Sequence, residues 1–259
     1  MAQRLIAVAG AAADDPEAPA RVEAALGGGP FALVVLFVSP VCPIDRVVAD
    51  LAARLAPCPV IGCTTAGEIL EGYTEGRIVA LGLPADRFAA ETLFIPDLDD
   101  LSPAALIGKV ARARARLADA RPGWENDFAF LMVDGLSTRE DALAATLAAG
   151  LGPVPLFGGS AADGTRFLET FVIADGRAWR NAAILALVRT ECPVRVFSLD
   201  HLRPTGVRMV VTEADPARRI VRQINAEPAA VEYARLLGKD PAQLSPFTFA
   251  AHPVVVRIG

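Results

Sequence analysis

The stretch that decides the fold is residues 31–67, which read FALVVLFVSPVCPIDRVVADLAARLAPCPVIGCTTAG. Val34–Val38 is apolar throughout, which is typical of a strand buried on both faces of a sheet. In Ile44–Leu55 the apolar residues recur every three or four positions, which predicts an amphipathic helix. A second apolar segment, Pro59–Ile61, follows a proline-flanked turn. The stretch therefore predicts a strand–helix–strand (βαβ) unit.

The same pattern recurs 96 residues further along the chain. Residues 127–163 read DFAFLMVDGLSTREDALAATLAAGLGPVPLFGGSAAD and align with residues 31–67 without a gap. A repeat of this kind indicates a duplicated supersecondary unit, so we predict that the two βαβ units superpose. The second copy contains predicted strands at Phe130–Val133 and Pro155–Phe157 and a predicted helix at Glu140–Leu151.

The rest of the chain extends each copy. We predict an α/β fold of internally duplicated βαβ-plus-meander halves, with buried mixed sheets flanked by helices. The predicted domains are residues 1–205, in halves of about 1–100 and 101–205, and residues 206–259. The further predicted strands are Arg77–Leu83, Phe88–Ile95, Leu168–Ile173, Ala182–Val188, Val194–Leu199 and Val207–Thr212, and the further predicted helices are Pro103–Ala120, Pro216–Ile224 and Ala229–Leu237.

Composition excludes several classes of protein. Apolar residues make up 53% of the chain and charged residues 21%, which is ample for a core and excludes wholesale disorder. The net charge of -5 argues against a nucleic-acid binder. No apolar run reaches the roughly 20 residues of a membrane-spanning helix. Without an export signal or a CxxC pair, the four cysteines fit a reducing cytoplasm, so we expect no disulfide bond.

Two loops of small residues follow the second strand of each copy: Gly62–Glu68 (GCTTAGE) and Gly158–Gly164 (GGSAADG). Glycine lets a ligand approach the backbone closely, and Ser and Thr hydroxyls add hydrogen-bonding groups. Such loops can hold a carboxylate or phosphate in a nest of N–H groups, although they could also be turns between strands. Because pseudo-equivalent halves can converge on one cleft, we expect the loops to line one shared pocket.

Side chains near these loops complete the candidate site. Asp134 lies at the tip of a first strand, where open α/β folds place ligand contacts, and Ser39 lies at nearly the same place in the first copy. Glu68, Asp134 or Asp163 could meet an amine. The candidate ligand-binding residues are Ser39, Gly62, Cys63, Thr64, Thr65, Gly67, Glu68, Asp134, Gly158, Gly159, Ser160, Ala161 and Asp163.

Catalytic and metal sites are disfavoured. Cys63 is the best candidate nucleophile, but catalysis needs a base, and the spacing brings neither His201 nor His252 near it. A buried, inert cysteine is the favoured interpretation, so no catalytic residue is predicted. Scattered histidines and cysteines offer no clustered metal-ligand set. Either histidine alone could ligate a haem iron.

At PVIGCTTAGE (59–68) and PLFGGSAADG (155–164) the chain resembles the FIST family, the F-box and intracellular signal transduction proteins. FVSP (37–40), Asp134-Gly135 and VTEA (211–214) carry the resemblance further. The resemblance implies a FIST N-terminal domain over residues 1–205. It also implies that residues 206–259 are the start of a C-terminal domain, apparently truncated.

The resemblance also implies a sensory function, because the family senses small ligands, with amino acids proposed. We expect a cytoplasmic, non-enzymatic sensor without a cofactor. It would bind an amino acid or similar small carboxylate and signal to a separate protein such as a kinase or cyclase. We expect no nucleic-acid or membrane partner. The alternatives are a haem-based nitric oxide sensor that uses His201 or His252, and a Cys63-dependent enzyme.

Overall fold

The computed structural model describes residues 5–198 and 202–255, and the chain divides into two compact units, Met1–Phe197 and Ser198–Gly259. His201, one of the two candidate haem ligands, lies outside the described residues. The elements of the N-terminal unit are β1 (Ala7–Ala12), α1 (Ala18–Leu26), β2 (Phe31–Val38), α2 (Ile44–Leu55), β3 (Val60–Thr64), β4 (Glu68–Ile69), β5 (Tyr73–Thr74), β6 (Arg77–Pro84), β7 (Phe88–Ile95), α3 (Pro103–Ala120), β8 (Asn126–Val133), α4 (Glu140–Leu151), β9 (Leu156–Ser160), β10 (Val172–Ala174), β11 (Arg177–Trp179) and β12 (Ala183–Thr190).

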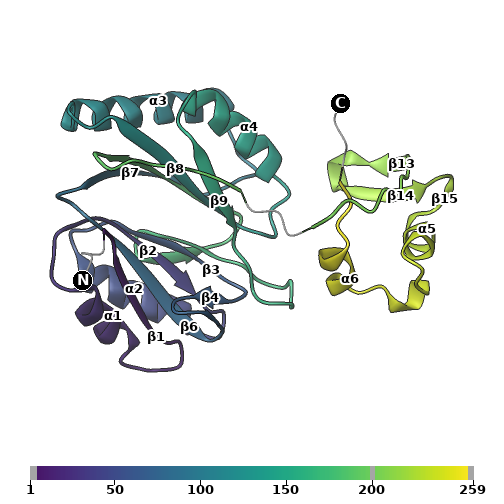
Figure 1. Cartoon of the computed structure of the whole chain (residues 1–259), viewed down its shortest axis with the longest axis horizontal. Helices are drawn as coiled ribbons and strands as arrows, with labels where there is room; N and C mark the ends of the chain where they lie inside the picture. The colour runs from purple at the N-terminus through teal and green to yellow at the C-terminus, as the bar shows by residue number, and fades with distance from the viewer. Residues whose placement is uncertain (1–4, 199–201, 256–259) are drawn as a thin grey trace. The chain divides into compact units, whose positions relative to one another are not determined.

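These elements stack in four layers, helix–sheet–sheet–helix (Figure 1). The first sheet has the strand order β1-β6-β2-β3-β10-β11, and the second has the order β7-β12-β8-β9. Helices α1 and α2 cover the outer face of the first sheet, and α3 and α4 cover the outer face of the second. The predicted α/β class, with buried mixed sheets flanked by helices, is confirmed.

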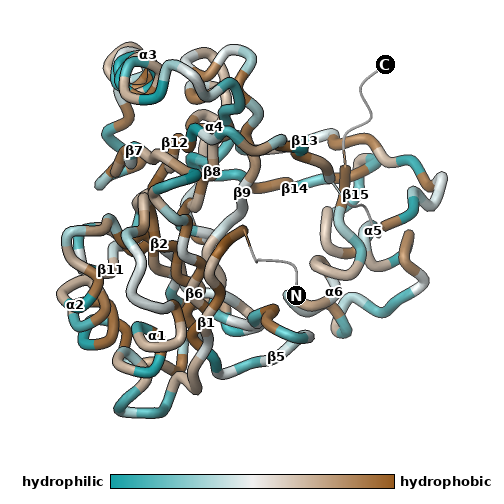
Figure 2. Tube along the Cα trace, turned by 60° about the vertical axis from the view of Figure 1, so that its left-hand side comes forward, coloured by the Kyte–Doolittle hydropathy of each residue, from teal (hydrophilic) through white to brown (hydrophobic). Residues whose placement is uncertain are grey.

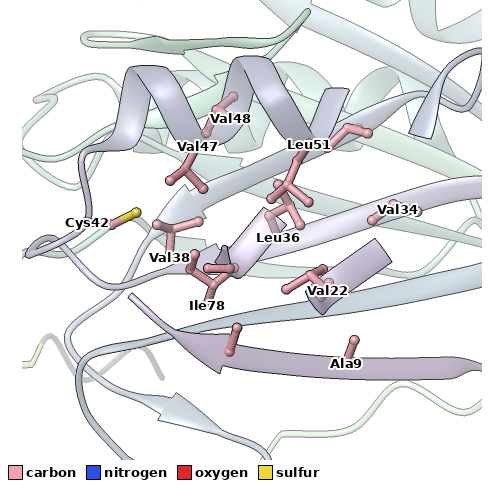
Figure 3. Packing of buried hydrophobic residues seen from close by; sticks show 14 of the residues in the cluster. Ala9, Val22, Val34, Leu36, Val38, Cys42, Val47, Val48, Leu51 and Ile78 are labelled. Carbon is pink, nitrogen blue, oxygen red and sulfur yellow. The ribbon is translucent and has the colours of Figure 1, made fainter. Parts of the chain in front are cut away.

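Apolar strands are buried on both faces because each sheet lies between helices and the other sheet. In β2, Val34, Leu36 and Val38 point toward Val47 and Leu51 of α2 (Figure 3). The alternate residues of β2 pack between the two sheets instead. β8 and β12 are divided in the same way. The hydropathy colouring accordingly shows brown along β2 (Figure 2).

The two halves share one strand order, but they are divided differently from the prediction. Four strands of each sheet follow the same sequence of positions, β1-β6-β2-β3 in the first and β7-β12-β8-β9 in the second. β7 therefore opens the second half, whereas the prediction assigned Phe88–Ile95 to the first. The hairpin β10–β11, from the second half, extends the first sheet. The halves exchange strands and are not separate half-domains.

The strand register also differs from a gapless repeat. β2 pairs in parallel with β3 so that Leu36 lies opposite Gly62. β8 pairs in parallel with β9 so that Leu131 lies opposite Gly158, one residue earlier than the 96-residue offset requires. The loop between the first strand and the helix is therefore one residue longer in the second copy. Superposition of the units stays a prediction, with this shift included.

Both glycines nevertheless have the same kind of neighbour. A Cβ built on Gly62 would collide with the carbonyl oxygen of Leu36, and one built on Gly158 would collide with that of Leu131. Each glycine is therefore required by the close approach of the paired strand.

Two predicted strands of the N-terminal unit are wrong in part. Val194–Phe197 forms no strand, and residue 199 lies outside the described residues. Leu168–Thr170 lies in a loop, because Asp163 binds its backbone, and β10 begins only at Val172.

The C-terminal unit begins with a three-stranded sheet where a helix was predicted at Pro216–Ile224. Ile220, Val221 and Ile224 are all β-branched, which favours a strand. Its elements are β13 (Val211–Asp215), the 3-10 turn Pro216–Arg218, β14 (Ile220–Ile224), β15 (Glu227–Pro228), α5 (Ala229–Leu236), the 3-10 turn Pro241–Gln243 and α6 (Pro246–Ala251). Among the described residues, no helix is both long and apolar enough to span a bilayer.

Candidate functional site

The two small-residue loops lie side by side. The backbone N–H of Ala162 donates to the carbonyl oxygen of Thr64 at 2.9 Å. The loops also start in the same way: the N–H of Thr65 donates to Val38 at 3.1 Å, and that of Ala161 donates to Val133 at 2.7 Å. In both cases the acceptor is the last residue of the preceding parallel strand. The expectation that the loops lie at one place in the molecule therefore agrees with the geometry, whereas a shared pocket stays a prediction.

The first loop is held by the buried carboxylate of Glu68. Its Oε1 accepts a hydrogen bond from the hydroxyl of Thr65 at 2.6 Å, and its Oε2 accepts one from the backbone N–H of Arg77 at 3.0 Å. Gly67 lies under the ring of Tyr73, where a Cβ would come within 2.5 Å of the phenol oxygen. Glu68 is therefore a structural acceptor that fixes the loop shape.

The second loop is held by the carboxylate of Asp163 in the same manner. Its Oδ1 accepts from the N–H of Phe167 at 2.9 Å, and its Oδ2 accepts from Leu168 at 2.8 Å and Glu169 at 3.0 Å. Burial raises the pKa of Asp163, but these backbone donors outweigh burial and hold the pKa below its usual value. Phe167 is forced to a φ of 54°, a region that bulky residues rarely occupy.

Both carboxylate oxygens of Asp134 also accept hydrogen bonds from within the chain. The buried carboxylate accepts hydrogen bonds from the hydroxyl of Thr170, the N–H of Asn181 and the N–H of Leu136. The side chain therefore joins the end of β8 to the loop before β10 and to the segment before β12. Ser39, at the matching end of β2, is buried, and its N–H donates to the carbonyl of Arg77 at 2.9 Å.

Thr64 also joins the first loop to the segment before β10. Its N–H donates to the carbonyl of Phe171 at 2.9 Å, and its hydroxyl accepts from the N–H of Phe171 at 3.0 Å. Thr170 and Phe171 were not predicted as site residues. No local motif marks them, because their partners are 36 and 107 residues away in the sequence.

The exposed part of the site is the edge strand β9. Gly158, Gly159 and Ser160 are exposed, and β9 is the last strand of its sheet, so one side of its backbone has no strand partner. A Cβ built on Gly159 meets no atom within 4 Å, so the space in front of this residue is open. Of the predicted site residues, these three offer the most accessible backbone.

Aromatic rings adjoin this strand on the face between the sheets. Phe157, which is 42% exposed, lies with its ring centroid 4.9 Å from that of Phe130 and 5.8 Å from that of Phe128. Phe130 in turn lies 6.4 Å from Phe37 of β2. The prediction missed these rings as site residues, although the alternation of phenylalanines in β8 was a usable signal. They place an apolar surface beside the open backbone at Gly159, which shares the inter-sheet face of β9 with Phe157.

The predicted nucleophile lies in the core. Cys63 is 4% exposed, and burial raises the pKa of its thiol to about 12, so the thiolate is not populated at neutral pH. All four cysteines are free thiols. His252 is exposed after α6, where its backbone carbonyl accepts a hydrogen bond from Tyr233. Across residues 5–198 and 202–255, no cluster of three or more His, Cys, Asp or Glu could hold a metal ion.

Comparison with known proteins identifies a family. The sequence model described as the FIST N domain matches residues 32–227, which include both small-residue loops and most of the chain. No curated protein matches the chain.

Proposed function

Because the chain belongs to the FIST family, whose domains are sensory domains of signal transduction, we propose that its N-terminal unit binds an amino acid or a similar small carboxylate. The observation that carries the proposal is the exposed edge of β9, where open space lies in front of Gly159 beside the ring of Phe157. Small ligands are commonly held by a few polar groups next to apolar side chains.

Two kinds of contact would hold the ligand. The side of the β9 backbone that faces away from β8, together with the exposed hydroxyl of Ser160, can donate to a carboxylate. The ring of Phe157, which is supported from behind by Phe130, can cover an apolar side chain. The site therefore favours amino acids with apolar side chains over acidic ones.

The geometry changes the expected role of three acidic residues. Glu68, Asp134 and Asp163 are buried, and each accepts hydrogen bonds from its own chain. A ligand amine would have to displace those donors to reach any of them. We propose that they shape the loops and that backbone carbonyls at the edge of β9 accept from the amine.

We propose that the protein is a cytoplasmic sensor rather than an enzyme, and that it signals to a separate protein such as a kinase or cyclase. The burial of Cys63 supports a non-catalytic function, because its thiol lies in the inter-sheet core without a base beside it. The proposed sensor uses no cofactor and contacts neither nucleic acid nor membrane, in line with the net charge of -5.

The test is ligand-induced thermal stabilisation of the full chain against a panel of amino acids, in the wild type and in Gly159→Val. The added side chain has room, so folding should be retained, but it fills the space that the ligand would occupy. Gly123→Val is the matched control, since Gly123 also faces open space without a positive φ and lies in the loop before β8. Loss of the shift in Gly159→Val alone supports the proposal. An equal shift in all three proteins contradicts it.

A further inference from the structure

A cavity of about 280 Å³ lies in the N-terminal unit, at the opposite end of β3 from the candidate functional site. It is lined by Val60 and Ile61, the first residues of β3, whereas the small-residue loop follows Thr64, the last residue. The turn of the β10–β11 hairpin and the residues between α2 and β3 line it from the first sheet, and β7 and β12 line it from the second.

The size of this cavity suits one small molecule. An apolar cavity of about 150 Å³ is known to hold benzene, so the space here accepts a single aromatic ring with a short substituent. Its walls are about half apolar, and Ile61, Phe94 and Ile184, from three different strands, contribute to the apolar part. The ring of Phe94 is held in place by Trp179, whose centroid lies 5.0 Å away.

Two polar side chains define the rest of the ligand. Thr92 lies on the inter-sheet face of β7 between Ala90 and Phe94, where the other side chains are apolar. Its hydroxyl has no hydrogen-bond partner within the described part of the chain. Asp175 is the one charged residue among the described residues that line the cavity, and its side chain is exposed at the hairpin turn. A cationic group is therefore favoured at the mouth.

We propose that this cavity binds a small aromatic amine, with the ring between Ile61, Phe94 and Ile184. The ammonium group faces Asp175, and the hydroxyl of Thr92 bonds to a polar substituent on the ring where the amine carries one. The site is independent of the carboxylate site proposed above, because it uses different residues at the other end of β3.

Cys58 provides a direct readout of occupancy. Its thiol lines the cavity, is half-buried and donates only to the carbonyl of the next residue, Pro59, at 3.4 Å. A ligand in the cavity covers this sulfur. Cys192 is also half-buried but does not line the cavity, so the same molecule contains its own control.

The experiment measures the rate at which iodoacetamide modifies each cysteine of the full chain, by peptide mapping, at increasing concentrations of 2-phenylethylamine. We expect saturating amine to slow the modification of Cys58 at least about fivefold and to leave Cys192 unchanged. 3-Phenylpropionate, which carries the same ring and the opposite charge, should protect much less. An unchanged rate at Cys58, equal slowing at Cys192, or equal protection by the anion overturns the proposal.

Two variants test the polar contacts. Asp175→Asn removes the charge and keeps the turn, because Asn tolerates the φ of 52° found there. Thr92→Val removes the hydroxyl and keeps the shape of the side chain. Asp175→Asn should weaken protection by 2-phenylethylamine about fivefold, whereas Asp86→Asn, at the exposed β6–β7 turn, should not. Tyramine, which adds a phenolic hydroxyl to the same amine, should protect the wild type about fivefold better than 2-phenylethylamine, and Thr92→Val should remove that advantage. Unchanged protection by 2-phenylethylamine in Asp175→Asn overturns the assignment of the charge, and an unchanged advantage of tyramine in Thr92→Val overturns the assignment of the hydroxyl.

Discussion

Removal of the Asp163 carboxylate separates a structural role from a ligand-binding role for this residue. In the structure it accepts three backbone hydrogen bonds, from Phe167, Leu168 and Glu169, at 2.8–3.0 Å. It is 3% exposed and keeps Phe167 in the left-handed region. Asp163→Ala therefore removes the acceptor of all three hydrogen bonds in the loop after β9.

The loss in free energy of unfolding expected for Asp163→Ala follows from the number of hydrogen bonds removed and from the solvent exposure of their donors. A hydrogen bond to a charged group contributes about 1.5–3 kcal/mol when both partners are buried. Here the donors belong to exposed residues, since Phe167 is 50% and Leu168 is 68% exposed, so their N–H groups regain water in the variant. About 1 kcal/mol for each bond is then appropriate, and Asp163→Ala should lower the free energy of unfolding by about 3 kcal/mol. Asp163→Asn, which keeps one acceptor oxygen, should lose about half as much.

The assay is urea denaturation followed by tryptophan fluorescence. Trp124 and Trp179 are the only tryptophans and both lie in the N-terminal unit, so the signal reports on that unit alone. A change of less than about 0.5 kcal/mol in Asp163→Ala would refute the reasoning, because surface substitutions without a structural role fall in that range. Loss of the ligand-induced thermal shift with unchanged stability would return Asp163 to the ligand-binding residues.

Three further outcomes are expected. The pKa of Asp163 is lowered in the folded state, so this residue contributes stability that is present at neutral pH and is lost as the pH falls through the lowered pKa. The difference in the free energy of unfolding between wild type and Asp163→Ala should therefore shrink on acidification below about pH 4. A difference that stays constant with pH would contradict this. Gly62→Ala should lower the free energy of unfolding by at least about 2 kcal/mol in the same urea assay, because the added Cβ collides with the carbonyl of Leu36. A variant as stable as the wild type would show that the paired strands move apart at little cost. At pH 8, iodoacetamide should modify Cys192 in the folded protein and Cys63 only in denaturant, because burial raises the pKa of Cys63 to about 12; rapid modification of folded Cys63 would revive a catalytic role.

The sequence indicated that the two loops lie together, but not which of their carboxylates are hydrogen-bonded within the chain. The repeat placed the loops after β3 and β9 at equivalent points, and Ala162 indeed bonds to Thr64. The assignment of Asp134 to a ligand did not anticipate that its donors, Thr170 and Asn181, come from segments 36 and 47 residues later. A carboxylate that looks free in a local motif can have its hydrogen bonds filled by donors far away in the sequence. Local spacing carries no information about those donors.

What the sequence by itself determined is the local structure of the βαβ units. The bounds of α2, α3, α4 and β7 agree with the predicted ranges, because the period of apolar residues is a local property that directly reflects the geometry of a helix or strand. Burial of β2 on both faces followed from the same signal, since a strand that is apolar at every position has two faces to cover.

Only the tertiary structure decided which sheet each strand joins and which carboxylates are satisfied. β7 pairs with β12, 88 to 102 residues further along the chain, and the β10–β11 hairpin joins the first sheet by pairing with β3. Such pairings depend on the summed packing of whole sheets, and many partners present equally apolar edges. The open edge of β9 has the same origin, because it results from the final strand order.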